Sequence, residues 1–129
     1  MNIESPTVSP NKSAKEMFDF LADPANFEKI MPENIDKFET RENGFVFALK
    51  GMPEIKLKIK ELVEHEKVVL GAASDKLPFT LTGHIYEIDE HSSDVQLVFD
   101  GKFNPMMAMM VKGPLKKFIN TLSENIEAL

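Results

Sequence analysis

The sequence predicts an α+β protein in which a curved antiparallel sheet of about seven strands wraps round a long C-terminal helix. Three observations support this fold class: two helix-start signals near the N-terminus, alternating apolar residues from Lys37 to Lys102, and helical apolar spacing after Asn104. The expected order is strand, two short helices, six strands and helix. A length of 129 residues with 43% hydrophobic content is typical of one compact domain, here expected to span residues 1–129.

Composition excludes several kinds of partner and site. Lys and Arg number 15 against 21 Asp and Glu, and the net charge of -6 repels a phosphate backbone, so we expect no nucleic-acid partner. The absence of cysteine excludes disulfides and thiolate metal sites. The N-terminus lacks a signal-peptide pattern, and no apolar run approaches the roughly 18 residues of a membrane span. We therefore expect a cytoplasmic protein with no integral membrane association.

The N-terminal quarter predicts a short strand followed by two short helices. The β-branched stretch at residues 3–8 indicates an opening strand. Ser13 and Glu16 have the spacing of a capping box, which begins a helix over about residues 13–22. Asp23 before a proline is a second start signal, and the next proline ends that short helix.

A period of two then predicts six antiparallel strands joined by short turns. The clearest alternation sets Leu57 and its apolar neighbours against Lys56, Lys58 and Lys60, so one face meets a core and the other meets water. Two successive apolar residues after Lys60 indicate either a bulge or the twisting end of a long strand. The expected turns lie at residues 42–44, 51–53, 65–67, 75–78 and 89–93.

The last quarter predicts a long amphipathic helix that covers the sheet. Asn104 is the expected cap and Pro105 lies in the first turn. Gly113 and Pro114 are expected to kink the helix or to separate its first two turns. The predicted apolar stripe consists of Met107, Met110, Val111, Leu115, Phe118, Ile119, Leu122 and Ile126.

This element order, with the segments SAKEMFDFLAD at residues 13–23 and FEKIMP at residues 27–32, resembles the START-like, or SRPBCC, superfamily. That superfamily has the helix-grip fold and includes polyketide cyclases and lipid-transfer domains, and the resemblance covers nearly the whole chain. It implies a cavity between sheet and helix that holds an apolar or amphipathic small molecule. It transfers no catalytic residue, because no catalytic motif is present to match.

The candidate cavity wall combines inward-facing sheet residues with the start of the closing helix. Four methionines lie within residues 106–110, and methionine fills irregular space without fixing one packing arrangement. Ordinary core packing is the alternative interpretation of these residues. Met106 and Met109 fall off the stripe, so they either line the cavity mouth or form an exposed partner surface. The predicted wall consists of Phe45, Phe47, Leu57, Leu70, Phe79, Leu81, Leu97, Phe99, Phe103, Met107, Met110 and Val111.

The remaining polar residues predict no catalytic, metal or cofactor site. His65 and His91 lie in acidic turns, and no pair of histidines has the spacing of a metal site. His84 and Tyr86 share a strand face, but the alternation directs both away from the apolar face. Three residues near the expected rim are most simply solvated surface groups: Glu54, Asp75 and Lys76.

The leading hypothesis is binding or transport of a small hydrophobic molecule by a monomer or weak homodimer. One alternative is a cyclase-type or hydratase-type enzyme that uses the same cavity. The other is a ligand-free interaction module that docks through Met106, Met109 and the break from Gly113 to Pro114. An ionisable side chain projecting into the cavity would favour the enzyme.

Overall fold

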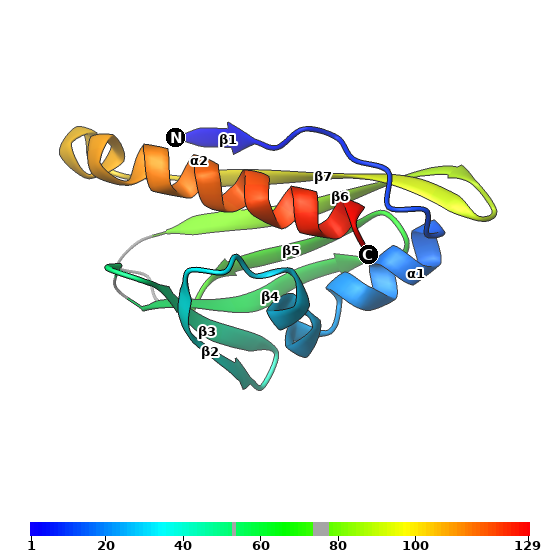
Figure 1. Cartoon of the computed structure of the whole chain (residues 1–129), viewed down its shortest axis with the longest axis horizontal. Helices are drawn as coiled ribbons and strands as arrows, with labels where there is room; N and C mark the ends of the chain where they lie inside the picture. Colours follow the sequence, from blue (N-terminus) through cyan, green and yellow to red (C-terminus); the bar gives the residue numbers. More distant parts are fainter. Residues whose placement is uncertain (53, 74–77) are drawn as a thin grey trace.

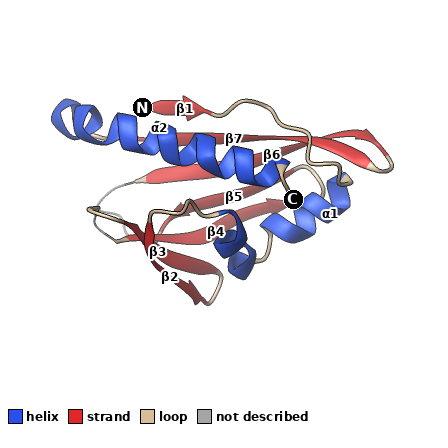
Figure 2. Ribbon diagram, viewed as in Figure 1, coloured by secondary structure: helices blue, strands red, loops and turns tan. Residues whose placement is uncertain are grey.

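The computed structural model describes residues 1–52, 54–73 and 78–129, which form one seven-stranded antiparallel sheet with its helices on the concave face (Figures 1 and 2). The strand order is β1-β7-β6-β5-β4-β3-β2, so strands β2 to β7 pair with their neighbours in sequence and β1 adds beyond β7. This arrangement confirms the predicted α+β class. The elements are β1 (Asn2–Glu4), α1 (Ala14–Leu21), the 3₁₀ helix η1 (Pro24–Ile30), β2 (Ile35–Arg41), β3 (Gly44–Leu49), β4 (Ile55–Val63), β5 (Lys67–Ala72), β6 (Phe79–Asp89), β7 (Ser92–Gly101) and α2 (Pro105–Glu127).

The two N-terminal helices begin at the predicted caps. The Ser13 hydroxyl accepts the Glu16 N–H and the Glu16 carboxylate accepts the Ser13 N–H, both at 3.1 Å. The Asp23 carboxylate accepts the Ala25 N–H at 3.1 Å and so caps η1. The opening strand is shorter than predicted, because Pro6 has no N–H to donate and Val8 makes only an isolated bridge to β7.

The strand periodicity agrees with the observed burial. In β4, Leu57 is buried on the concave face while Lys56, Lys58 and Lys60 are exposed. The register between β4 and β5 shifts between Ile59 and Glu61, which agrees with the first of the two predicted alternatives, a bulge. The turns predicted at residues 51–53 and 75–78 lie partly outside the described residues.

The closing helix α2 crosses the concave face as one continuous segment (Figure 1). Its cap is confirmed, since the Asn104 side chain accepts the Met107 N–H at 2.8 Å. Of the two outcomes predicted at Gly113 and Pro114, the separation of the first two turns is wrong, because one helix runs through both residues. Pro114 removes one backbone hydrogen bond, but its ring and Gly113 are both exposed, so the helix continues past them without disturbing the core.

The predicted apolar stripe of α2 is wrong at Met110, whose side chain is 73% exposed. Met110 precedes the buried Leu115 by five residues, which places it about 140° round the helix from that position. Val111 precedes Leu115 by four residues and therefore shares its face. The C-terminal half of the stripe is buried as predicted, at Leu115, Phe118, Ile119, Leu122 and Ile126.

We expect Ser13→Ala to lower the free energy of unfolding by about 1 kcal/mol, because the first turn of α1 then has an amide without an acceptor. Urea unfolding monitored by circular dichroism measures the change. A variant with unchanged stability would show that this cap is not formed in solution.

Glu16→Gln should change how stability depends on pH. Hydrogen bonds from the Ser13 N–H and hydroxyl lower the pKa of the Glu16 carboxyl below its ordinary value. The stabilisation is therefore fully present above the unfolded-state pKa and is lost as the pH falls through the folded-state pKa. Urea titrations across this acidic range should show a smaller loss of stability in Glu16→Gln than in wild type.

Candidate functional site

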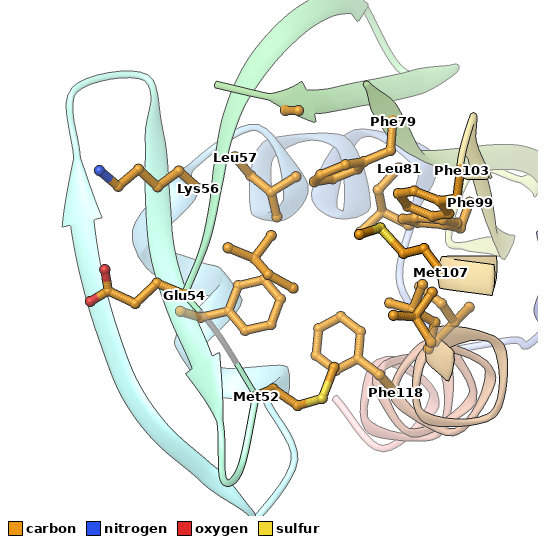
Figure 3. A pocket seen from close by; sticks show the side chains of 16 residues that line it. Met52, Glu54, Lys56, Leu57, Phe79, Leu81, Phe99, Phe103, Met107 and Phe118 are labelled. Carbon is orange, nitrogen blue, oxygen red and sulfur yellow. The ribbon is translucent and has the colours of Figure 1, made fainter. Parts of the chain in front are cut away.

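A cavity of about 420 Å³ lies between the concave face of the sheet and α2 (Figure 3). Ligand sites in proteins typically measure about 300 to 1,000 Å³, so its size suits a small molecule. The side chains at its wall come from strands β3 to β7, from the chain that flanks them, and from α2. They are Phe47, Met52, Glu54, Ile55, Lys56, Leu57, Ala72, Phe79, Leu81, Phe99, Phe103, Met107, Val111, Leu115, Phe118 and Ile119.

Strand register and helix periodicity together assemble this wall. Antiparallel pairing places residues of neighbouring strands side by side on the concave face, as for Leu57 with Ala72 and Leu81 with Phe99. On α2, Met107 and Val111 begin a row of wall residues spaced four apart along one side of the helix. The wall therefore follows from the alternation of side chains along the strands and from the helical spacing of apolar residues in α2.

Stacked aromatic rings form two parts of the wall. The rings of Phe79 and Phe99 are stacked with their centroids 5.4 Å apart, and those of Phe99 and Phe103 with their centroids 6.1 Å apart. On the other side, Phe118 of α2 stacks on Phe47 of β3 at 4.9 Å. Figure 3 shows the first group across the cavity from Phe118. Such pairs add about 0.5–1.5 kcal/mol each beyond burial, which helps to fix the shape of the cavity.

The two charged residues at the wall direct their charged groups outward. Figure 3 shows the Glu54 carboxylate and the Lys56 ammonium pointing away from the cavity. The Lys37 ammonium donates a hydrogen bond to the Glu54 carboxylate, which lowers the pKa of Glu54 and raises the pKa of Lys37. Within residues 1–52, 54–73 and 78–129, the interior of the cavity is thus lined by apolar side chains.

Most of the predicted wall residues line the cavity: Phe47, Leu57, Phe79, Leu81, Phe99, Phe103, Met107 and Val111. Their contact with a ligand stays a prediction. Phe45 is not part of the cavity wall. Its ring stacks on the rings of Phe27 and Phe38, with centroid distances of 4.9 Å and 5.2 Å. Leu70 and Leu97 are not part of this wall and border a separate void of about 10 Å³ beside α1 and η1. Met110 faces outward, opposite to its predicted direction.

The prediction missed several wall residues for identifiable reasons. Leu115, Phe118 and Ile119 belong to the predicted apolar stripe, and their spacing from Met107 already placed them on its face. Met52 lies in a turn, where no periodicity indicates the direction of a side chain.

The other polar residues singled out in the sequence lie away from the cavity or outside the described chain. The rings of His84 and Tyr86 stack at 6.2 Å on the outer face of β6, as the alternation predicted. Asp75 and Lys76 fall outside the described residues. The described chain contains no cluster of three metal-ligating side chains, and none of its helices is long and apolar enough to cross a membrane.

No protein-family model and no curated protein sequence matches this chain. Several solved structures, in contrast, match its fold. A point mutant of norcoclaurine synthase from Thalictrum flavum, in complex with a transition-state analogue, superposes with a TM-score of 0.71 at 13% identity, over 98% of this chain and 93% of that chain. The solution structure of the KanY protein gives a TM-score of 0.76 at 13% identity, over 98% and 94% of the two chains.

A START superfamily protein from Mycobacterium smegmatis gives a TM-score of 0.66 at 15% identity, over 98% of this chain and 97% of that chain. These similarities confirm the predicted resemblance: the chain has the helix-grip fold of START-like proteins. At such low identity they show the fold alone.

We expect Phe118→Ala to lower the free energy of unfolding by about 3 kcal/mol, because the buried ring holds α2 against Phe47. Phe79→Ala is the matched comparison at the opposite wall. Its ring is partly exposed, so the expected loss is smaller, about 1–2 kcal/mol. Urea unfolding measures both, and equal losses would contradict the unequal burial of the two rings.

Proposed function

We propose that this protein binds a small hydrophobic or amphipathic molecule in the cavity between the sheet and α2. The observation that carries the proposal is a cavity of about 420 Å³ with an apolar lining in the described part of the chain. Binding sites for small molecules are typically concave and mostly apolar, with few polar groups.

The size of this space sets it apart from ordinary packing. Protein interiors are packed nearly as densely as organic crystals and contain few voids larger than a water molecule. An apolar wall offers water few hydrogen-bond partners, so ordered water is a poor filling for the interior of this cavity. An apolar ligand would supply the dispersion contacts that the wall residues lack.

The expected affinity is modest. If a ligand buried about 200 to 300 Å² of apolar surface, the gross gain at about 25 cal/mol/Å² would be roughly 5 to 8 kcal/mol. The loss of translational and rotational freedom on association offsets at least about 4 kcal/mol of this gain. The polar end of an amphipathic ligand would lie toward the mouth, where it stays hydrated.

Binding has better support than catalysis. Norcoclaurine synthase, in its complex with a transition-state analogue, is an enzyme with this fold, but the similarity to it extends only to the fold. Enzymes stabilise developing charge with polar groups aimed at the reacting atoms. In the described part of the wall, the charged groups of Glu54 and Lys56 point away from the cavity. The described part of the wall therefore offers no polar side chain that could act in a cyclase or hydratase reaction.

The test is the uptake of a fatty acid whose attached dye fluoresces more strongly in apolar surroundings. We expect wild-type protein to raise the fluorescence in a saturable way. Met107→Trp should reduce the affinity tenfold or more, because the larger side chain occupies part of the cavity. Glu124→Trp, an exposed position on the same helix, is the matched control and should bind like wild type.

Absence of saturable uptake by wild-type protein, or equal affinity in Met107→Trp, would overturn the proposal. Circular dichroism and urea unfolding verify that both variants are folded. Native mass spectrometry of gently purified protein adds a second readout, because it detects a co-purified molecule and also tests the expected monomer or weak homodimer.

A further inference from the structure

The first turns of α2 carry an apolar patch on the side facing away from the cavity. Met106, Met109 and Met110 are 75%, 85% and 73% exposed, more than any other large apolar side chain in the described chain. Single exposed apolar residues are common on protein surfaces, but three neighbouring methionines on one helix face form a contiguous patch. We call these three residues the methionine patch.

Lysines continue this face along the helix. Lys116 follows Met109 by seven residues and Lys117 follows Met110 by seven, which is two helical turns and therefore nearly the same direction. Lys112 is also exposed beside them. From Lys102 to Ser123 the chain has four lysines and no aspartate or glutamate, although its net charge is -6. No ion pair links the α2 lysines to a carboxylate of the described residues.

We propose that this face of α2 docks on an anionic lipid surface. The methionine patch would enter the boundary between headgroups and acyl chains, and Lys112, Lys116 and Lys117 would lie against the anionic headgroups. A helix with an apolar patch next to exposed lysines has the features of interfacial helices, and each lysine near an anionic membrane contributes on the order of 1 kcal/mol, or about fivefold in binding.

The composition of the face favours lipid over a protein partner. Methionine is also common at protein interfaces, so the charge of the face decides: residues 102–123 contain four lysines and no carboxylate. Methionine is flexible and adapts to a fluid environment, while lysine stems extend along apolar surface and keep the charge in water. A uniformly positive face next to an apolar patch is complementary to the anionic interface of a bilayer.

Within α2, the nearest carboxylate lies two helical turns beyond the lysines. The next acidic residue of α2, Glu124, follows Lys117 by seven residues, about 10 Å along the helix axis. This spacing exceeds the screening length of about 8 Å at physiological ionic strength. The lysines therefore act on a nearby surface with little opposition from Glu124.

Docking in this way would bring the lipid close to the cavity wall. Met107 and Val111 line the cavity from the same turns that present the methionine patch outward. These turns form the left end of α2 in Figure 1. The start of the helix thus has an apolar cavity on one side and an apolar surface on the other.

The test is co-sedimentation with vesicles of phosphatidylcholine containing phosphatidylserine, compared with vesicles of phosphatidylcholine alone. We expect wild-type protein to bind the anionic vesicles more tightly and to dissociate as salt is raised. Lys116→Gln with Lys117→Gln should weaken binding by about tenfold or more. Lys58→Gln with Lys60→Gln, which removes two exposed lysines from the outer face of β4, is the matched control and should leave binding unchanged.

A second comparison addresses the methionine patch. Met106→Gln with Met109→Gln and Met110→Gln should weaken binding by tenfold or more, while glutamine keeps a similar helix propensity. Ile88→Gln removes an apolar side chain that is 59% exposed elsewhere and should bind like wild type. Circular dichroism confirms that each variant is folded.

Three results would overturn the proposal. The first is wild-type protein that fails to sediment with anionic vesicles, and the second is control variants that lose as much binding as the patch variants. The third is light scattering that gives the mass of a dimer for wild-type protein and of a monomer for the methionine variant. The last result would identify a second copy of the chain as the occupant. The fatty-acid assay contains no vesicles, so failure of ligand binding and failure of docking are observed separately.

Discussion

The packing of the C-terminal half of α2 against the concave face of the sheet is the contact on which the rest of the structure depends. Ile119, Leu122 and Ile126 are completely or almost completely buried there, and the Asn125 amide donates to the Ile30 carbonyl of η1 at 2.8 Å. Helices α1 and η1 fill the same end of the sheet, where Phe27 stacks on Phe45. A straight helix cannot follow a curved sheet along its whole length, so tight packing at this end leaves space beneath the earlier turns. The cavity is the geometric result.

The methionine-rich start of α2 follows from this position. Its turns border the cavity on one side and project from the body of the protein on the other, so the two sides of the helix have different environments. Met107 lies at the cavity wall, whereas Met110, three residues later, is 73% exposed. A flexible apolar side chain tolerates both settings. The four methionines of residues 106–110 look alike in the sequence, but Met107 faces the cavity and the other three face outward. Their different angular positions around the helix axis cause this division.

This division shows how far the sequence determines the structure. Caps and strand alternation depend on neighbouring residues, so the capping box at Ser13 and the bulge after Ile59 could be predicted. Periodicity identifies the face on which a residue lies, but not what covers that face. Phe45 and Leu97 both point to the concave side as predicted, yet α1 and η1 cover them and they do not reach the cavity. Met52 was missed because a turn has no period from which its direction follows.

The composition of the wall also determines what kind of recognition it can provide. A site that hydrogen-bonds its ligand rejects an analogue that lacks the bonding group by a large factor, whereas one extra methylene in an apolar pocket changes binding only about 10- to 200-fold. Here the stacked rings of Phe79, Phe99 and Phe103 would select by shape at one side, while Met107 on α2 would adapt to the ligand at the other. Such a wall discriminates by length and bulk more than by functional group.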